Sequence, residues 1–174
     1  MLSCVQKISG LIVFLFAGNA FAMSKISDRD LIVSLRNNLP CFSYPIDEET
    51  KNEGYSFGYM DVTWNDRESS LPGHLAWTLD IDIDNKIPVY PNKPDFCLGY
   101  GDTPPGTSDK RKGAALPMRY DVSYRAHMSV LKKGSTYTRK YETWFCLSRN
   151  KANQTIILQA NWKRATSKFE CVPL

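Results

Sequence analysis

Strict two-residue alternation of apolar and polar side chains is the feature that most constrains this fold. It is longest from Met118 to Val130, and it returns with Tyr141, Phe145 and Leu147 on one side of the next segment. Alternation at this period places apolar groups on one face of a strand, whereas an amphipathic helix needs them three or four residues apart. We find no segment with the helical spacing. The pattern therefore predicts an all-β chain.

Shorter segments of the same character surround these two. Apolar or β-branched runs closed by Asn, Gly or Pro predict further strands at 31–36, 41–44, 55–64, 74–84, 155–162 and 167–172. About eight antiparallel strands in one chain predict a single immunoglobulin-like antiparallel β-sandwich with disulfides. The segment from Leu116 to Tyr120 resembles a tyrosine corner, with Tyr120 as the corner residue.

Two of these segments carry information beyond their length. In 55–64 apolar residues occur at both odd and even positions, which predicts a strand covered on both sides or one with an exposed aromatic face. In 74–84 the apolar residues share one side, and the polar side carries Asp80, Asp82 and Asp84. We expect that polar side to face solvent.

The first 22 residues predict a cleaved secretory signal. Lys7 precedes an apolar run that begins at Leu11, and Ala20 and Ala22 form an A-x-A cleavage site. The run is far shorter than the ~20 residues that span a bilayer. Cleavage after Ala22 leaves 23–174 as one β-sandwich domain. Because Cys4 precedes the apolar run, it cannot be a lipid-anchoring cysteine, and we expect a periplasmic protein without a lipid anchor.

Charge excludes two classes of partner. The chain has 22 Lys and Arg against 18 Asp and Glu, and loss of Lys7 with the signal lowers the net charge from +4 to +3. This excess is too small to predict binding to nucleic acid or to a membrane surface.

Four cysteines remain in the mature chain, Cys41, Cys97, Cys146 and Cys171. An even number in an exported chain predicts two disulfides, and the wide spacings exclude a CxxC redox motif and a zinc site. Three pairings are possible. We favour Cys97–Cys146 across the core, with Cys41–Cys171 joining the two ends of the mature chain.

No arrangement of residues predicts catalysis, a metal site or a cofactor. The Asp80, Asp82 and Asp84 series lacks the glycine and glutamate of a calcium loop. His74 and His127 have no nucleophile in a known motif beside them, so we expect solvated surface histidines and no enzyme activity.

Charged side chains on a strand face and in a loop are better candidates for binding a partner. We expect the interface to include Asp80, Asp82 and Asp84, together with Lys110, Arg111 and Lys112 in the loop that follows Gly106. Arg119, Arg125 and His127 are candidates for internal partners of the three aspartates. Charged strand faces and loops on a rigid sandwich usually carry recognition.

Several short motifs occur in a fixed order: Asn37-Asn-Leu-Pro-Cys41, Pro88-Val-Tyr-Pro91, Asp95-Phe-Cys-Leu-Gly-Tyr-Gly101, Pro104-Pro-Gly106, Leu116-x-x-x-Tyr120 and Phe145-Cys-Leu147. This series, within 31–148, resembles the small enterobacterial family of type VI secretion immunity periplasmic lipoproteins. Members carry a lipid-anchoring cysteine at the cleavage site, where this chain has Ala22-Met23.

The resemblance implies a periplasmic immunity protein that binds a secreted antibacterial effector and occludes its active site, with no catalysis of its own. Two other functions stay open. One is a structural or assembly protein of the envelope, of the chaperone or adhesin kind, that offers an edge strand. The other is a hydrolase or carbohydrate-binding module that uses the acidic strand face.

Overall fold

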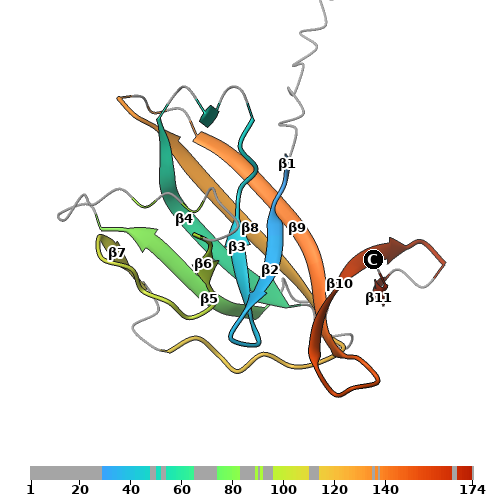
Figure 1. The fold of residues 1–174 in the computed structure, drawn as a ribbon. Helices are drawn as coiled ribbons and strands as arrows, with labels where there is room; N and C mark the ends of the chain where they lie inside the picture. Colours follow the sequence, from blue (N-terminus) through green and yellow to red (C-terminus); the bar gives the residue numbers. More distant parts are fainter. Residues whose placement is uncertain are drawn as a thin grey trace, which may run out of the picture.

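A computed structural model of the chain describes residues 29–47, 50–51, 54–64, 74–82, 89, 91, 96–109, 114–134, 136, 138–165 and 168–173. The predicted signal at 1–22 lies outside them. The described residues form two sheets that pack face to face (Figure 1), so the predicted antiparallel β-sandwich with disulfides is confirmed.

The larger sheet has eight strands, in the order β11-β10-β9-β8-β4-β5-β7, with β1 beside β9. Their bounds are β1 Arg29–Asp30, β4 Tyr55–Trp64, β5 His74–Ile81, β7 Thr107–Ser108, β8 Ser123–Lys132, β9 Thr138–Arg149, β10 Thr155–Lys163 and β11 Lys168–Val172. Neighbouring strands are antiparallel, except that β1 runs parallel to β9.

The smaller sheet contains β2 Ile32–Arg36, β3 Leu39–Ser43 and β6 Leu98–Gly99, in the order β2-β3-β6. Asn37 and Asn38 join β2 to β3 with φ angles of 54° and 62°. A two-residue hairpin turn of this kind needs positive φ at both positions, and asparagine tolerates it better than most residues. The Asn-Asn pair therefore fixes the register of this hairpin.

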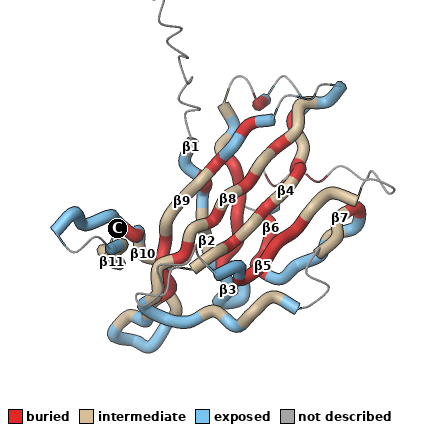
Figure 2. The backbone as a smooth tube through the Cα atoms, turned by 180° about the vertical axis from the view of Figure 1, so that it is seen from behind, coloured by how far each residue is buried: buried red, intermediate tan, exposed pale blue. Residues whose placement is uncertain are grey.

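Aromatic side chains from both sheets meet in the core. Phe42 of β3 lies edge-on to Phe145 of β9 at 5.8 Å between ring centroids, and it stacks against Trp77 of β5 at 6.3 Å. All three rings are almost fully buried. Alternation of buried and partly exposed residues is visible along β8 from the back of the molecule (Figure 2). The longest alternating segment is thus a core strand, as predicted.

A bulge in β4 explains why its apolar residues occupy both odd and even positions. Phe57 pairs with Val130, but Tyr59 pairs with Ser129, so Gly58 is an extra residue. A bulge reverses the sides to which later residues point. Tyr55, Phe57, Met60 and Val62 are consequently all buried, and Tyr59 lies on the outer face.

The tyrosine corner is present, but its residue is Tyr124 and the prediction of Tyr120 is wrong. The Arg119 backbone N–H donates to the Tyr124 hydroxyl at 2.7 Å, and that hydroxyl donates to the Arg119 carbonyl at 3.4 Å. Tyr120 is 37% exposed. The chain from Leu116 to Val122 precedes β8 as an irregular segment, so the strand starts later than the alternation suggested.

Tyr124→Phe should lower the free energy of unfolding by about 1–3 kcal/mol, because it leaves the Arg119 amide without its partner next to a buried ring. Tyr120→Phe makes the same chemical change where the hydroxyl contacts only Thr155 on the surface, at 3.1 Å. It should change stability by less than about 0.5 kcal/mol. Urea denaturation of both variants tests this, and equal losses would contradict the assignment.

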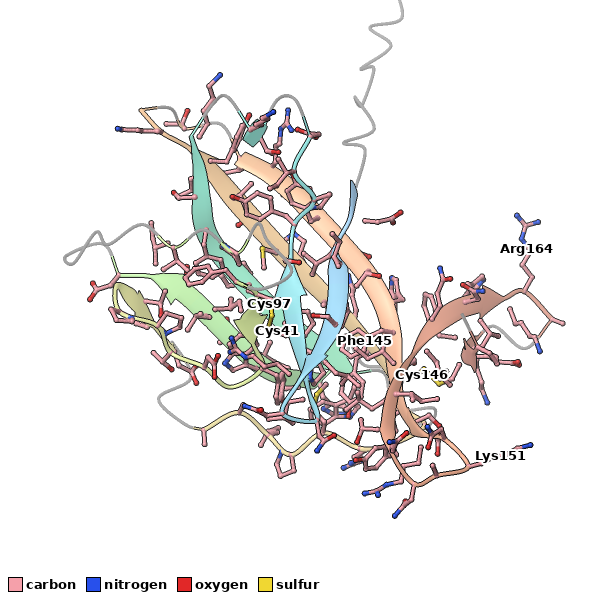
Figure 3. All side chains as sticks on the ribbon, in the orientation of Figure 1. Cys41, Cys97, Phe145, Cys146, Lys151 and Arg164 are labelled. Atoms are coloured by element: carbon pink, nitrogen blue, oxygen red, sulfur yellow. A yellow bond between two sulfur atoms is a disulfide. The ribbon has the colours of Figure 1, made fainter. Side chains whose placement is uncertain are left out.

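Both disulfides form, but the favoured pairing is wrong. The bonds are Cys41–Cys97 and Cys146–Cys171. Phe145 points into the core, so its neighbour Cys146 points away, and Figure 3 shows the two on opposite sides of β9. Cys97 leads into β6, which pairs with β3 next to Cys41. The opposite orientation of Cys146 therefore excludes a bond to Cys97 through the core.

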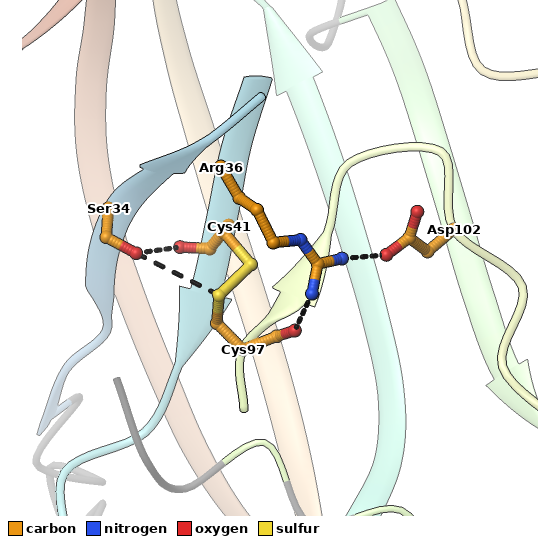
Figure 4. Close-up of a disulfide and its surroundings, with 5 residues drawn as sticks. All are labelled: Ser34, Arg36, Cys41, Cys97 and Asp102. Atoms are coloured by element: carbon orange, nitrogen blue, oxygen red, sulfur yellow. Dashed lines mark hydrogen bonds and ion pairs between the residues drawn. A yellow bond between two sulfur atoms is a disulfide. The ribbon is translucent and has the colours of Figure 1, made fainter. Parts of the chain in front are cut away.

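The two disulfides indicate an oxidising environment for an exported chain. Cys41–Cys97 is held in the smaller sheet by its neighbours (Figure 4). Ser34 Oγ donates to the Cys41 carbonyl at 3.3 Å, and Arg36 Nη1 donates to the Cys97 carbonyl at 3.3 Å while Nη2 pairs with Asp102. Among the described residues, no helix is long and apolar enough to cross a membrane.

Candidate functional site

Two of the six predicted interface residues belong to the described structure. Asp80 of β5 lies opposite Ser108 of β7, and the Asp82 N–H donates to the Gly106 carbonyl at 2.8 Å. Both aspartates are half-buried. Asp84, Lys110, Arg111 and Lys112 lie outside the described residues. The structure therefore places Asp80 and Asp82 at the edge of the larger sheet, next to the strand that leads into the basic loop.

The polar side of β5 is the outer face at Thr78 and Asp80, as the sequence predicts, but Thr78 is largely covered and the alternation of sides breaks at Ala76. Ala76 and Thr78 are 1% and 5% exposed, whereas Leu75 is 37% exposed. Val62 pairs with Trp77 and Thr63 pairs with Leu75, so Ala76 is an extra residue. This second bulge turns Leu75 to the outer face.

Four polar side chains form a continuous line across the outer face of the larger sheet. We call it the polar row, and its members are Thr78 of β5, Asp61 of β4, His127 of β8 and Glu142 of β9. Each lies directly opposite the next in the strand register. Cross-strand neighbours on one face are close enough to interact. The register thus gathers residues from four strands into one line of potential contacts.

Asp61 and His127 form the centre of the polar row. Asp61 Oδ1 lies 3.1 Å from His127 Nδ1, and the two side chains are 13% and 16% exposed. The Tyr59 ring packs beside the imidazole, with ring centroids 6.2 Å apart. The expectation of a solvated surface histidine is therefore wrong for His127. His74 is exposed, and its ring lies against Trp64.

Glu142 ends the polar row and links it to two further residues. Arg125 Nη2 donates to Glu142 Oε2 at 2.5 Å, and Trp144 Nε1 donates to Glu142 Oε1 at 3.1 Å. Burial by itself raises the pKa of the Glu142 carboxyl, but the hydrogen bond and charge of Arg125 outweigh it and hold that pKa below its ordinary value of 4.5. The carboxylate is therefore a fixed negative charge with both oxygens bound.

The pKa of Tyr59 shifts in the opposite direction to that of Glu142. Burial raises the pKa of its phenol above the ordinary 10.0, and the carboxylates of Asp61 and Asp80 add to this, against a hydrogen bond with Thr78. The phenol consequently stays neutral at physiological pH. A neutral hydroxyl on a half-buried ring can donate or accept a hydrogen bond to a partner.

The three residues that are candidate partners of the aspartates each have another contact. Arg125 binds Glu142, His127 contacts Asp61, and the Arg119 guanidinium lies 5.7 Å from the centre of the Trp64 ring. Across the described ranges, no three His, Cys, Asp or Glu side chains are grouped so that they could hold a metal ion. The polar row is therefore a surface of paired charges and aromatic rings.

Lowering the pH should destabilise the protein partly through Glu142. The pKa of Glu142 is lower in the folded state than its ordinary value of 4.5. The contribution of Glu142 to the free energy of unfolding is therefore fully present above pH 4.5, and it is lost as the pH falls through the folded-state pKa. Arg125→Met should move the Glu142 titration to higher pH and reduce the part of the acid-induced loss of stability that comes from Glu142. Carboxyl NMR titration measures it, with Lys133→Met as a control that removes one cation from a distant turn. Identical Glu142 titrations in both variants would contradict the pairing.

Comparison with known proteins adds no assignment. No family model, curated protein or solved structure matches the chain.

Sequence reasoning missed the polar row because its members are far apart in the chain. Asp61 and Glu142 have no pattern of their own, and His127 was only one polar position in an alternating strand. Gly58 was the available signal, since glycine inside a strand often marks a bulge. A bulge there would have placed Tyr59 beside Asp61 on the outer face.

Proposed function

We propose that this chain is a periplasmic immunity protein that binds a secreted antibacterial effector and neutralises it by occlusion. The observation that carries the proposal is the outer face of the larger sheet, where Asp61–His127 and Arg125–Glu142 are paired beside Tyr59. The order of the short motifs between 31 and 148 supports the same function, through the family resemblance that they create.

Occlusion requires a surface that is ordered before binding. Side chains that are already held in hydrogen bonds lose little conformational freedom when a partner docks, so more of the contact energy remains as affinity. The members of the polar row are fixed on four adjacent strands, and two disulfides brace the sandwich around them. Such a surface suits tight binding without chemistry by this chain.

The expected interface extends to the edge of the sheet at Asp80 and Asp82. Tyr59 lies opposite Asp80 in the register, so the polar row and this edge form one continuous region of the outer face. The remaining predicted residues, Asp84 and Lys110 to Lys112, follow in the adjoining segments. Charged groups around an interface mainly speed the encounter and select the partner.

The gene neighbourhood provides the first test. A toxin gene beside this one should encode a protein that kills cells when it is directed to the periplasm, and co-expression of this chain should restore growth.

The purified pair should co-elute as a one-to-one complex. Asp61→Ala/Glu142→Ala should weaken that complex, whereas Lys133→Ala, in a turn, should leave it unchanged. A strain that lacks the chain and still competes normally against effector-armed kin would overturn the proposal, as would co-purification with pilus or secretion subunits in place of a toxin.

A further inference from the structure

The C-terminal hairpin projects from the sandwich. β10 pairs with β9 only from Thr155 to Gln159, and beyond that point β10 and β11 pair only with each other up to Lys163 and Lys168. Figures 1 and 2 show this ribbon swinging away from the two sheets in both views. An element that extends beyond the body can reach into a recess of another molecule.

Two contacts hold the hairpin against β9, one at Cys171 and one at Phe169, which lies opposite Trp162 in the register. Cys171 is bonded to Cys146 of β9, and the Phe169 ring stacks on Trp144 with centroids 3.7 Å apart and planes at 9°. Both contacts join β11 to β9 across the outer face, although β10 lies between them in the sheet. The hairpin is thus presented in a fixed orientation, which lowers the entropic cost of binding.

The end of the hairpin combines an exposed tryptophan with cations. Trp162 is 53% exposed while its other side contacts the Phe169 ring edge-on at 5.1 Å. Lys163 pairs with Glu170, but Arg164 and Lys168 are exposed and have no ion-pair partner within the described part of the chain. Tryptophan and arginine are the residues most enriched at the energetic centres of protein interfaces.

The projecting part of the hairpin carries an excess of positive charge. Residues 160–174 contain Lys163, Arg164 and Lys168 against one acidic residue, Glu170. Their net charge of +2 is half of the +4 of the whole chain, in 15 of its 174 residues. The surface that complements this element is therefore acidic.

We propose that the β10–β11 hairpin is the principal anchor of the chain on its protein partner, and that the partner presents an acidic recess with an apolar pocket for Trp162. This inference rests on the proposed function in assuming a protein partner. An active-site cleft lined by paired carboxylates, as in enzymes that hydrolyse glycans, has the required charge. Occlusion would then place Arg164 and Lys168 among the carboxylates of the cleft.

The test uses a library of random twelve-residue peptides displayed on phage and selected on the immobilised full-length protein. Selected peptides should be rich in Asp and Glu with at least one large apolar residue. Titration of a synthetic selected peptide should show about 30-fold weaker binding to Trp162→Ala. Arg164→Glu/Lys168→Glu should weaken binding at least as much and reduce its dependence on salt.

Lys133→Glu/Lys140→Glu provides the matched control, because it makes the same change in net charge at exposed positions outside the hairpin. It should leave peptide binding within about twofold of the wild type. Binding that survives the hairpin substitutions, peptides without acidic bias, or no enrichment would each overturn the inference. Sedimentation with vesicles of equal phosphatidylglycerol and phosphatidylethanolamine, if it depended on Trp162 while acidic peptides did not bind, would assign the hairpin to a lipid surface. None of these results uses a toxin, so the proposed immunity function stands or falls separately.

Discussion

Trp77→Ala should lower the free energy of unfolding by about 3–5 kcal/mol, the range for removing a large aromatic side chain from a packed core. Trp77 of the larger sheet is 1% exposed and contacts two rings on the side of the smaller sheet, Phe42 of β3 at 6.3 Å and Tyr100 after β6 at 5.5 Å between centroids. The alanine variant leaves a cavity at the point where the two sheets meet. Urea denaturation followed by far-UV circular dichroism measures the loss.

Trp162→Ala is the matched control, since it makes the same substitution at a residue that is 53% exposed. It loses only the edge-on contact with Phe169, and stability should fall by at most about 1.5 kcal/mol. Trp77→Phe keeps an aromatic ring, so it provides a milder substitution that can be measured if the alanine variant does not fold. Similar losses for Trp77→Ala and Trp162→Ala would contradict the assignment of Trp77 to the core.

Alternation predicted the strands well because it reflects burial directly. The segment 55–64 coincides with β4, and the alternation that ends at Val130 contains most of β8. The short strands β6 and β7 have two residues each and pair through backbone groups, so they leave almost no pattern of side chains. Tertiary pairing decides such strands.

The faces of the strands were harder to predict than the strands themselves. Single extra residues at Gly58 and Ala76 reverse the sides that follow them, and strict alternation cannot represent this. The polar row depends on the same information. His127 lies opposite both Asp61 and Glu142 only because three strands have one particular register.

The disulfide pairing was predictable in part. Once Phe145 and Leu147 are assigned to the core face of β9, Cys146 must point outward, which excludes a bond through the core to Cys97. The sequence does not reveal which of the other cysteines reaches the outer face. That requires the position of β11 beside the outer face of β9, where the Phe169 ring stacks on Trp144.

Removing Cys41–Cys97 by Cys41→Ala/Cys97→Ala should cost about 4 kcal/mol of global stability. The two cysteines are 56 residues apart, and a crosslink across a loop of that length removes much of the conformational freedom of the unfolded chain. The bond joins β3 to the segment that enters β6, and Phe42 of β3 and Leu98 of β6 both belong to the core, so we expect the loss to be global. Chemical denaturation of the oxidised variant measures the loss.

Cys146→Ala/Cys171→Ala should have a smaller global effect and a larger local one. The 25-residue separation corresponds to about 3.5 kcal/mol in the same chain-entropy estimate. The loss of global stability should be smaller than this estimate if the hairpin opens while the sandwich stays folded, because segments with few core contacts unfold separately. Hydrogen exchange should therefore accelerate across β10 and β11 and remain slow in β4 and β8.

Non-reducing peptide mapping of the wild type must yield the 41–97 and 146–171 pairs. Recovery of a 97–146 peptide pair would refute both the pairing and the rigid hairpin that depends on it.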